Sequence, residues 1–138
     1  MLSDHIGSNA MNSVKQVNLG TGVTSIGWTS FKGCSSLSSI LIPGSVKQIK
    51  ASAFEGCSKL SSIIMPDSIA SIGGGAFYGC SKLNSFIIGD GVTAIADSVF
   101  SGCSSLKYVV IPENVVSCGN TMFYGCNALE KIIVRGKT

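Results

Sequence analysis

The sequence predicts a β-rich solenoid, in which short parallel strands stack on one another and each repeat adds one short helical turn. Five phenylalanines recur at one constant interval without insertion or deletion: Phe31, Phe54, Phe77, Phe100 and Phe123. Five cysteines keep the same interval: Cys34, Cys57, Cys80, Cys103 and Cys126. A glycine precedes each of these cysteines, and a leucine follows three residues later. Self-similarity at one fixed period of this length is the signature of a solenoid.

The repeats occupy residues 14–134. Five complete repeats begin at Val14, Leu37, Leu60, Leu83 and Leu106, and Leu129 begins a sixth that is incomplete. Residues 1–13 are an N-terminal tail without the repeat pattern, and residues 135–138 are a C-terminal tail. The segment 8–10, Ser-Asn-Ala before a methionine, has the form of an expression scar, so we exclude residues 1–10 from the fold prediction.

Each repeat contains two short apolar patterns. The first is LxxIxI, in which the last two apolar residues alternate with one outward position, as in Ile40 and Ile42. This alternation and the β-branched residues predict a short strand. A proline or glycine then marks a turn, and the pair VxxI, as in Val46 and Ile49, predicts a second extended segment on the opposite wall of the coil.

The motif AFxGC closes the repeat, for example at residues 53–57. It is too short for more than one or two helical turns, and its glycine can end such a turn by adopting a positive φ. One repeat alone exposes its apolar residues on an open ribbon. Stacking gives each of them a like neighbour above and below, so stability becomes a sum of repeat and interface contributions.

Composition excludes several classes of function. The net charge of +3 comes from ten basic residues that form no cluster, which argues against binding of nucleic acid. No run approaches the roughly 18 apolar residues that a membrane span requires, so we expect no membrane insertion. The only histidine is His5, in the tail, and there is no CxxC pair or phosphate-binding glycine motif, so we expect no metal and no cofactor.

The six cysteines are expected to be free. Five are one repeated position, and Cys118 stands where other repeats have an isoleucine. Residues stacked in register lie about 4.8 Å apart, whereas the Cβ atoms of a disulfide lie about 3.8 Å apart. We therefore interpret the cysteines as buried thiols that pack as small apolar residues.

No set of residues predicts an enzyme. Asp67, Asp90 and Glu113 share one column just after the proline or glycine, and they are the nearest approach to a paired-carboxylate site. Acidic residues at this place in a turn are ordinarily solvated turn residues. No acid, base and nucleophile converge elsewhere, so the chain is predicted to be non-catalytic.

The pattern LxxIxIPxxVxxIxxxAFxGCSx, which spans residues 14–134, resembles the BspA-type leucine-rich repeat, the 23-residue class also described from treponemal proteins. The departures are few, such as Gly20 and Gly89 in place of the proline. The resemblance implies a right-handed α/β-type horseshoe. It also implies a cell-surface or secreted adhesion module that binds a protein ligand, such as a host or matrix protein; the residues alone do not decide between these locations and the cytoplasm.

The candidate binding site is the outward position of the LxxIxI strands. Its members are Asn18, Leu41, Ile64, Ile87, Val110 and Ile133. Five are large and aliphatic, so we expect an apolar stripe on the concave sheet, with Tyr108 beside it as an anchor. The alternative is that β-branched residues occupy these positions because they fit a pleated surface.

Other interpretations stay open. The repeats could be an architectural spacer within a longer array, and aromatic residues near the turns could form a carbohydrate-binding surface: Trp28, Tyr78 and Tyr124. No polar capping repeat is evident at either end of the array, which leaves end-to-end or edge self-association as a further possibility.

Overall fold

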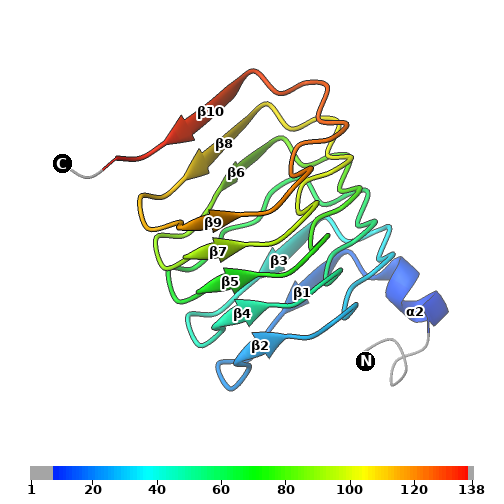
Figure 1. The fold of residues 1–138 in the computed structure, drawn as a ribbon. Helices are drawn as coiled ribbons and strands as arrows, with labels where there is room; N and C mark the ends of the chain where they lie inside the picture. Colours follow the sequence, from blue (N-terminus) through cyan, green and yellow to red (C-terminus); the bar gives the residue numbers. More distant parts are fainter. Residues whose placement is uncertain (1–7, 137–138) are drawn as a thin grey trace.

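The structure is a computed structural model that describes residues 8–136. Residues 1–7, which include His5, and residues 137–138 of the C-terminal tail lie outside the described range. The chain winds into a coil of stacked turns with two walls of short parallel strands (Figure 1). No helix in the described part is long and apolar enough to cross a membrane.

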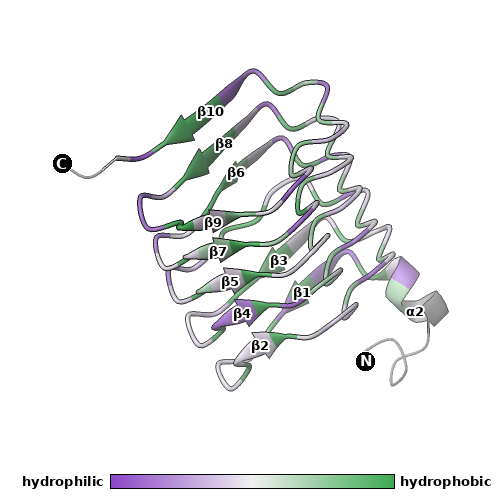
Figure 2. Cartoon of the chain, in the orientation of Figure 1, coloured by the Kyte–Doolittle hydropathy of each residue, from purple (hydrophilic) through white to green (hydrophobic). Residues whose placement is uncertain are grey.

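The first wall comes from the LxxIxI pattern. Its strands are β1 (Gln16–Asn18), β3 (Ser39–Leu41), β6 (Ser85–Ile87), β8 (Tyr108–Ile111) and β10 (Lys131–Val134). The pairing is parallel and joins equivalent positions of successive repeats, so that Ile87 lies opposite Val110, which lies opposite Ile133. The apolar character of β6, β8 and β10 is visible in Figure 2.

The second wall comes from the VxxI pattern. Its strands are β2 (Ser25–Ile26), β4 (Gln48–Ile49), β5 (Ser71–Ile72), β7 (Ala94–Ile95) and β9 (Ser117–Cys118). They form one continuous parallel sheet in the order β2-β4-β5-β7-β9, again with equivalent positions of successive repeats as partners. The second extended segment predicted from the sequence is thus confirmed.

The first wall is interrupted between the third and fourth repeats. Ile64 makes a single parallel bridge to Leu41, but within residues 8–136 no strand pairing joins it to Ile87. The wall is therefore divided into β1-β3 and β6-β8-β10, and we call the gap between 62–65 and 85–87 the seam. Phe86 stands in a core column that is otherwise aliphatic, and it is 1% exposed. We attribute the seam to this larger ring, which needs more room than the aliphatic side chain of its neighbours in the stack.

The core consists of continuous files of like side chains. The rings of the repeated phenylalanines stack with centroids 5.2–6.0 Å apart and planes within 12° of parallel. Phe86 meets the rings of Phe77 and Phe100 edge-on, at 4.9 and 4.8 Å. The repeated leucines and cysteines form parallel files that are also buried, apart from partly exposed Leu129 at the C-terminal end. These files supply the apolar burial that one repeat cannot supply by itself.

The segment expected to form a helical turn is a run of β-turns instead. In the first repeat, the N–H groups of Ser30, Lys32 and Cys34 donate to carbonyls three residues earlier. The alternate N–H groups of Thr29, Phe31 and Gly33 donate to carbonyls of the second repeat. Thr29 and Gly33 also have positive φ angles, of 54° and 72°. A helix needs consecutive right-handed residues and an internal hydrogen bond at every residue, whereas this segment has left-handed residues and internal bonds only at alternate residues.

The first described residues differ from the prediction as well. The N-terminal tail contains a short helix, α2 (Ser8–Ser13), whose Met11 is 4% exposed and belongs to the core cluster. Met11 belongs to the segment 1–13 that was predicted to be a tail, and no repeat pattern in the sequence signals its burial. Met11 therefore extends the same core cluster to which Phe31 and Cys34 of the first repeat belong.

Candidate functional site

The outward column of the first wall is a row of exposed aliphatic side chains. The exposed fractions are 60% for Leu41, 79% for Ile64, 52% for Ile87 and 41% for Ile133. Leu41, Ile87 and Ile133 are outward residues of pleated strands, and Ile64 has the equivalent position at its isolated bridge. Their neighbours point into the core, as Ile40 and Ile42 do at 6% exposure. We call this row, together with Tyr108 beside it, the aliphatic stripe.

Val110 is an exception to the predicted stripe, because it is only 6% exposed. It lies in register between Ile87 and Ile133 on the neighbouring strands. The valine side chain is shorter than either isoleucine, so its larger neighbours cover it. Val110 is thus part of the floor of the stripe and offers little surface to a partner.

A hollow of about 220 Å³ opens where the seam divides the first wall. Its lining is mostly apolar: Ser62, Ile63, Ile64, Met65, Ser85 and Ile87. The hollow could not be predicted from the repeat pattern, because the outward positions near it carry the same kinds of residue as the outward positions of the other repeats. The signals in the sequence are the two inward departures from isoleucine, Met65 and Phe86.

A second hollow, of about 240 Å³, lies at the C-terminal end of the same wall. It is lined by Lys107, Tyr108, Glu130, Lys131 and Ile133. Tyr108 is 39% exposed and stands directly beside Lys131 in the strand register. The predicted anchor therefore lies on the stripe, but among lysines rather than among aliphatic residues.

The acidic column of Asp67, Asp90 and Glu113 was predicted to consist of turn residues, and two of its members make contacts typical of turns. A carboxylate oxygen of Asp67 accepts the backbone N–H of Asp90 at 3.0 Å, and Asp90 forms an ion pair with Arg135 at 3.2 Å. No group of three or more metal-ligating side chains occurs within residues 8–136. The first contact joins neighbouring repeats and the second spans the repeat between its partners, as expected of exposed turn residues.

The cysteines form a file of thiols within the core. The thiol of Cys57 donates to the carbonyl oxygen of Phe31 at 3.1 Å, and Cys80, Cys103 and Cys126 make the same contact with the phenylalanine of the preceding repeat. Burial raises the pKa of Cys57 and of Cys103 to about 12, and it raises the pKa of Cys80 further. A thiol held neutral in this way is a poor nucleophile.

All six cysteines are free, as predicted, but Cys118 is exposed rather than buried. It continues a column of isoleucines, such as Ile95, that are buried within the second wall. β9 is the last strand of that wall in the described chain, so no further turn covers Cys118.

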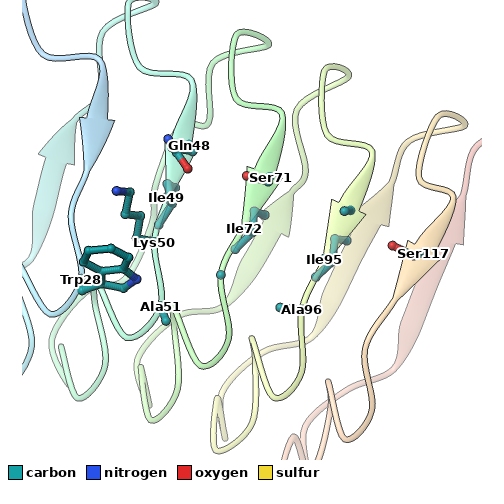
Figure 3. Close-up of a pocket in the computed structure, with 12 residues that line it drawn as sticks. Trp28, Gln48, Ile49, Lys50, Ala51, Ser71, Ile72, Ile95, Ala96 and Ser117 are labelled. Atoms are coloured by element: carbon teal, nitrogen blue, oxygen red, sulfur yellow. The ribbon is translucent and has the colours of Figure 1, made fainter.

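The outer face of the second wall carries a broad, shallow depression of about 610 Å³ (Figure 3). Small residues make its floor, among them Ser71, Gly73 and Ala94. A Cβ on Gly73 would collide with the backbone of Ala51, so close packing of the turns requires this glycine. At one end of the depression stands Trp28, 58% exposed, with the ammonium group of Lys50 4.2 Å from its ring centroid.

The other aromatic residues near the turns do not join this depression. Tyr78 and Tyr124 are exposed at 48% and 76%, in a column that belongs to the run of turns. Sequence reasoning grouped them with Trp28, whereas only Trp28 borders the depression.

Comparison with known proteins identifies relatives of the whole array. The sequence profile of the BspA type leucine rich repeat region matches residues 4–137 in six copies. Two solved structures are 30–32% identical in sequence to the chain over the parts that match. A leucine rich repeat protein of Treponema pallidum has 32% identity and a TM-score of 0.84 over 87% of this chain and 58% of its own. A leucine rich cell surface protein of Faecalibacterium prausnitzii has 30% identity and a TM-score of 0.68 over 90% of this chain and 40% of its own.

A third structure shows the fold alone. The pneumococcal vaccine antigen PcpA has 23% identity and a TM-score of 0.78 over 91% of this chain and 31% of its own. No curated protein matches the chain. The chain spans 58% or less of the length of these three similar structures.

Proposed function

The chain belongs to the BspA-type leucine-rich repeat family, and on this premise we propose that it is a non-catalytic protein-binding module that holds its ligand on the aliphatic stripe of the first wall. Repeat solenoids use their outward positions for recognition, because the inward positions are committed to packing. Membership of the family indicates the class of function, whereas the position of the binding site has to be argued from the residues of this chain.

One observation carries the proposal. Leu41, Ile64 and Ile87 are each more than half exposed and lie on successive turns of one wall. Single apolar residues on a surface need no explanation, but a contiguous row commonly marks an interaction site. Burial of one such side chain by a partner is worth about 1.5–3 kcal/mol, so a few of them are enough to support specific binding.

We propose an adhesive role at the cell surface or in the secreted fraction. The support is the relative from Faecalibacterium prausnitzii, which is a cell surface protein with 30% identity. A matrix or host-cell protein is the ligand that fits such a role.

A binding screen tests the proposal. The purified chain is applied to immobilised extracellular-matrix and cell-surface proteins, beside the Ile64→Lys and Ile87→Lys variants. Both residues are exposed, so the variants should fold normally, while a charge in the middle of the stripe should abolish binding. Val116→Lys is a matched control, because Val116 is 85% exposed and lies beside β9 in the second wall.

The outcomes separate the candidates. Loss of binding in the stripe variants, with normal binding by Val116→Lys, supports the stripe. Unchanged affinity in both stripe variants removes the first wall as the site. Absence of any protein ligand favours the architectural spacer as the alternative function.

Carbohydrate binding is a second candidate function, and Trp28 is the observation that favours it. An exposed indole beside a shallow depression can stack on a sugar ring, and the hydroxyl groups of Ser71 and Ser117 line the same depression. A glycan array with the wild-type chain and Trp28→Ala tests this candidate. Equal glycan binding by both chains, or none by either, would reject it.

A further inference from the structure

The two hollows on the first wall define the chemistry of the ligand, and this inference rests on the proposed function. We infer that the stripe takes an extended peptide segment of the partner. One apolar side chain of the segment enters the seam between Ile64 and Ile87, and one acidic side chain further along the segment pairs with Lys107 and Lys131.

The seam supplies the apolar end of this site. On the paired strands β6, β8 and β10, Val110 lies between Ile87 and Ile133 and is only 6% exposed. At the seam no strand pairing joins residues 62–65 to residues 85–87, and a hollow of about 220 Å³ lined by Ile64 and Ile87 opens there. A buried aliphatic or aromatic side chain of a partner is the kind of anchor that such a hollow accepts.

The lysine hollow supplies the charged end. Lys107 and Lys131 are both exposed, and neither forms an ion pair with any of residues 8–136. Glu130 lines the same hollow but lies beyond ion-pair distance of both lysines. The hollow thus keeps a net positive charge, and a carboxylate is its complement.

The acidic column on the other side of the stripe fixes the orientation. Asp67, Asp90 and Glu113 follow the proline or glycine at the turn, whereas Lys107 and Lys131 precede the outward column. Arg135 pairs with Asp90, so Asp67 and Glu113 are the members of the first border that repel a carboxylate of the ligand, whereas the two lysines attract it. The acidic residue must therefore lie on the side of the stripe where Tyr108 stands.

The separation of the two hollows gives the spacing in the peptide. They lie two repeats apart, which is about 10 Å at a strand spacing of about 4.8 Å. Lys131 stands two residues and Lys107 three residues before the outward column, which is about 7–10 Å along the strands. The resulting distance of about 12–14 Å equals about four residues of extended chain at about 3.3 Å each.

Selection of peptides tests the inference directly. A phage library of random decapeptides is panned on the purified wild-type chain. We expect enriched sequences to place an aliphatic or aromatic residue three to five positions from Asp or Glu. One enriched peptide is then synthesised, and its affinity is measured by fluorescence anisotropy at low and high salt.

Substitutions then locate each end of the peptide. Lys107→Ala combined with Lys131→Ala should weaken binding at least tenfold and remove its salt dependence, and replacing the acidic residue of the peptide by its amide should do the same. Glu130→Gln should strengthen binding severalfold. Lys47→Ala, an exposed lysine beside β4, is the matched control and should change nothing.

The failure of the inference can be told apart from failure of the proposed function. If Ile64→Lys abolishes peptide binding but the acidic residue and the lysines prove irrelevant, the inference is overturned and the stripe remains a binding surface. If enriched peptides bind Ile64→Lys normally, both are overturned. If no peptide is enriched, the peptide inference fails and the screen of whole proteins decides the function.

Discussion

Removing one ring from the phenylalanine file should cost more in the middle of the stack than at its start. Phe77 is fully buried and contacts three rings: Phe54 at 5.2 Å, Phe100 at 6.0 Å and Phe86 at 4.9 Å. Phe31 is 2% exposed and contacts one ring, that of Phe54 at 5.4 Å. The two residues are alike in chemistry and burial, and they differ in the number of stacked neighbours.

The magnitude follows from that difference. Replacement of a buried phenylalanine by alanine costs about 3–5 kcal/mol through lost burial and the cavity left behind. An aromatic pair adds about 0.5–1.5 kcal/mol beyond area burial, and Phe77 has two more pairs than Phe31. We therefore expect Phe77→Ala to lower the free energy of unfolding by about 5 kcal/mol, and by about 1–3 kcal/mol more than Phe31→Ala does.

Equilibrium unfolding in urea, followed by circular dichroism, measures both losses. Repeat arrays can unfold in parts, so hydrogen exchange of the flanking repeats should accompany the titration. Equal losses for the two variants, with equal slopes in urea, would contradict the view that stability comes from contacts between successive turns.

Two further predictions concern the thiol file and the seam. Burial keeps the thiols of the central repeats neutral, whereas the same thiols in the unfolded chain ionise near pH 9. The free energy of unfolding should therefore be at its full value below pH 9 and fall at higher pH, by about 1.4 kcal/mol per pH unit for each such thiol. In urea titrations from pH 8 to pH 11, Cys80→Ala should remove the contribution of one thiol, about 1.4 kcal/mol per pH unit, from the loss of unfolding free energy. An unchanged pH dependence would refute the view that the Cys80 thiol stays neutral in the folded chain. Across paired turns, Leu19 donates its N–H to Leu41 and Ile88 donates to Val110, and Met65 is the equivalent donor at the seam. Phe86→Ile should close the seam, so that exchange of the amide of Met65 slows although overall stability falls; unaltered exchange there would disprove our account of the seam.

The fold was predictable because each repeated residue has one dominant role. Leu60, Phe77 and Cys80 have counterparts in the repeats on both sides, and only stacking in register can bury all of them. Both strand patterns and the free thiols follow from the same spacing. The helical turn was predicted wrongly, because AFxGC has the composition of a capped helix, while its alternate N–H groups bond to the next repeat. Single-repeat reasoning misses such bonds between repeats.

The candidate site was predictable only in its periodic part. The outward positions of Leu41, Ile64 and Ile87 follow from the pleat, and their exposure agrees with it. The burial of Val110 depends on the size of its neighbours, and the seam depends on one core residue that breaks the pattern, Phe86. Departures from the repeat, rather than the repeat itself, therefore give this wall its shape.

Exposed apolar residues at the last strands of the walls differ from those that point outward in the middle of the coil, and only the second kind supports a functional argument. Cys118 and Ile132 are exposed because their strands, β9 and β10, are the last of their walls in the described chain. One more turn would cover both, since each continues an inward column that is buried elsewhere. Ile64 and Ile87 point out of the coil from its middle turns, so additional repeats at either end would leave them exposed. A function assigned to the stripe therefore does not depend on the number of repeats that flank it.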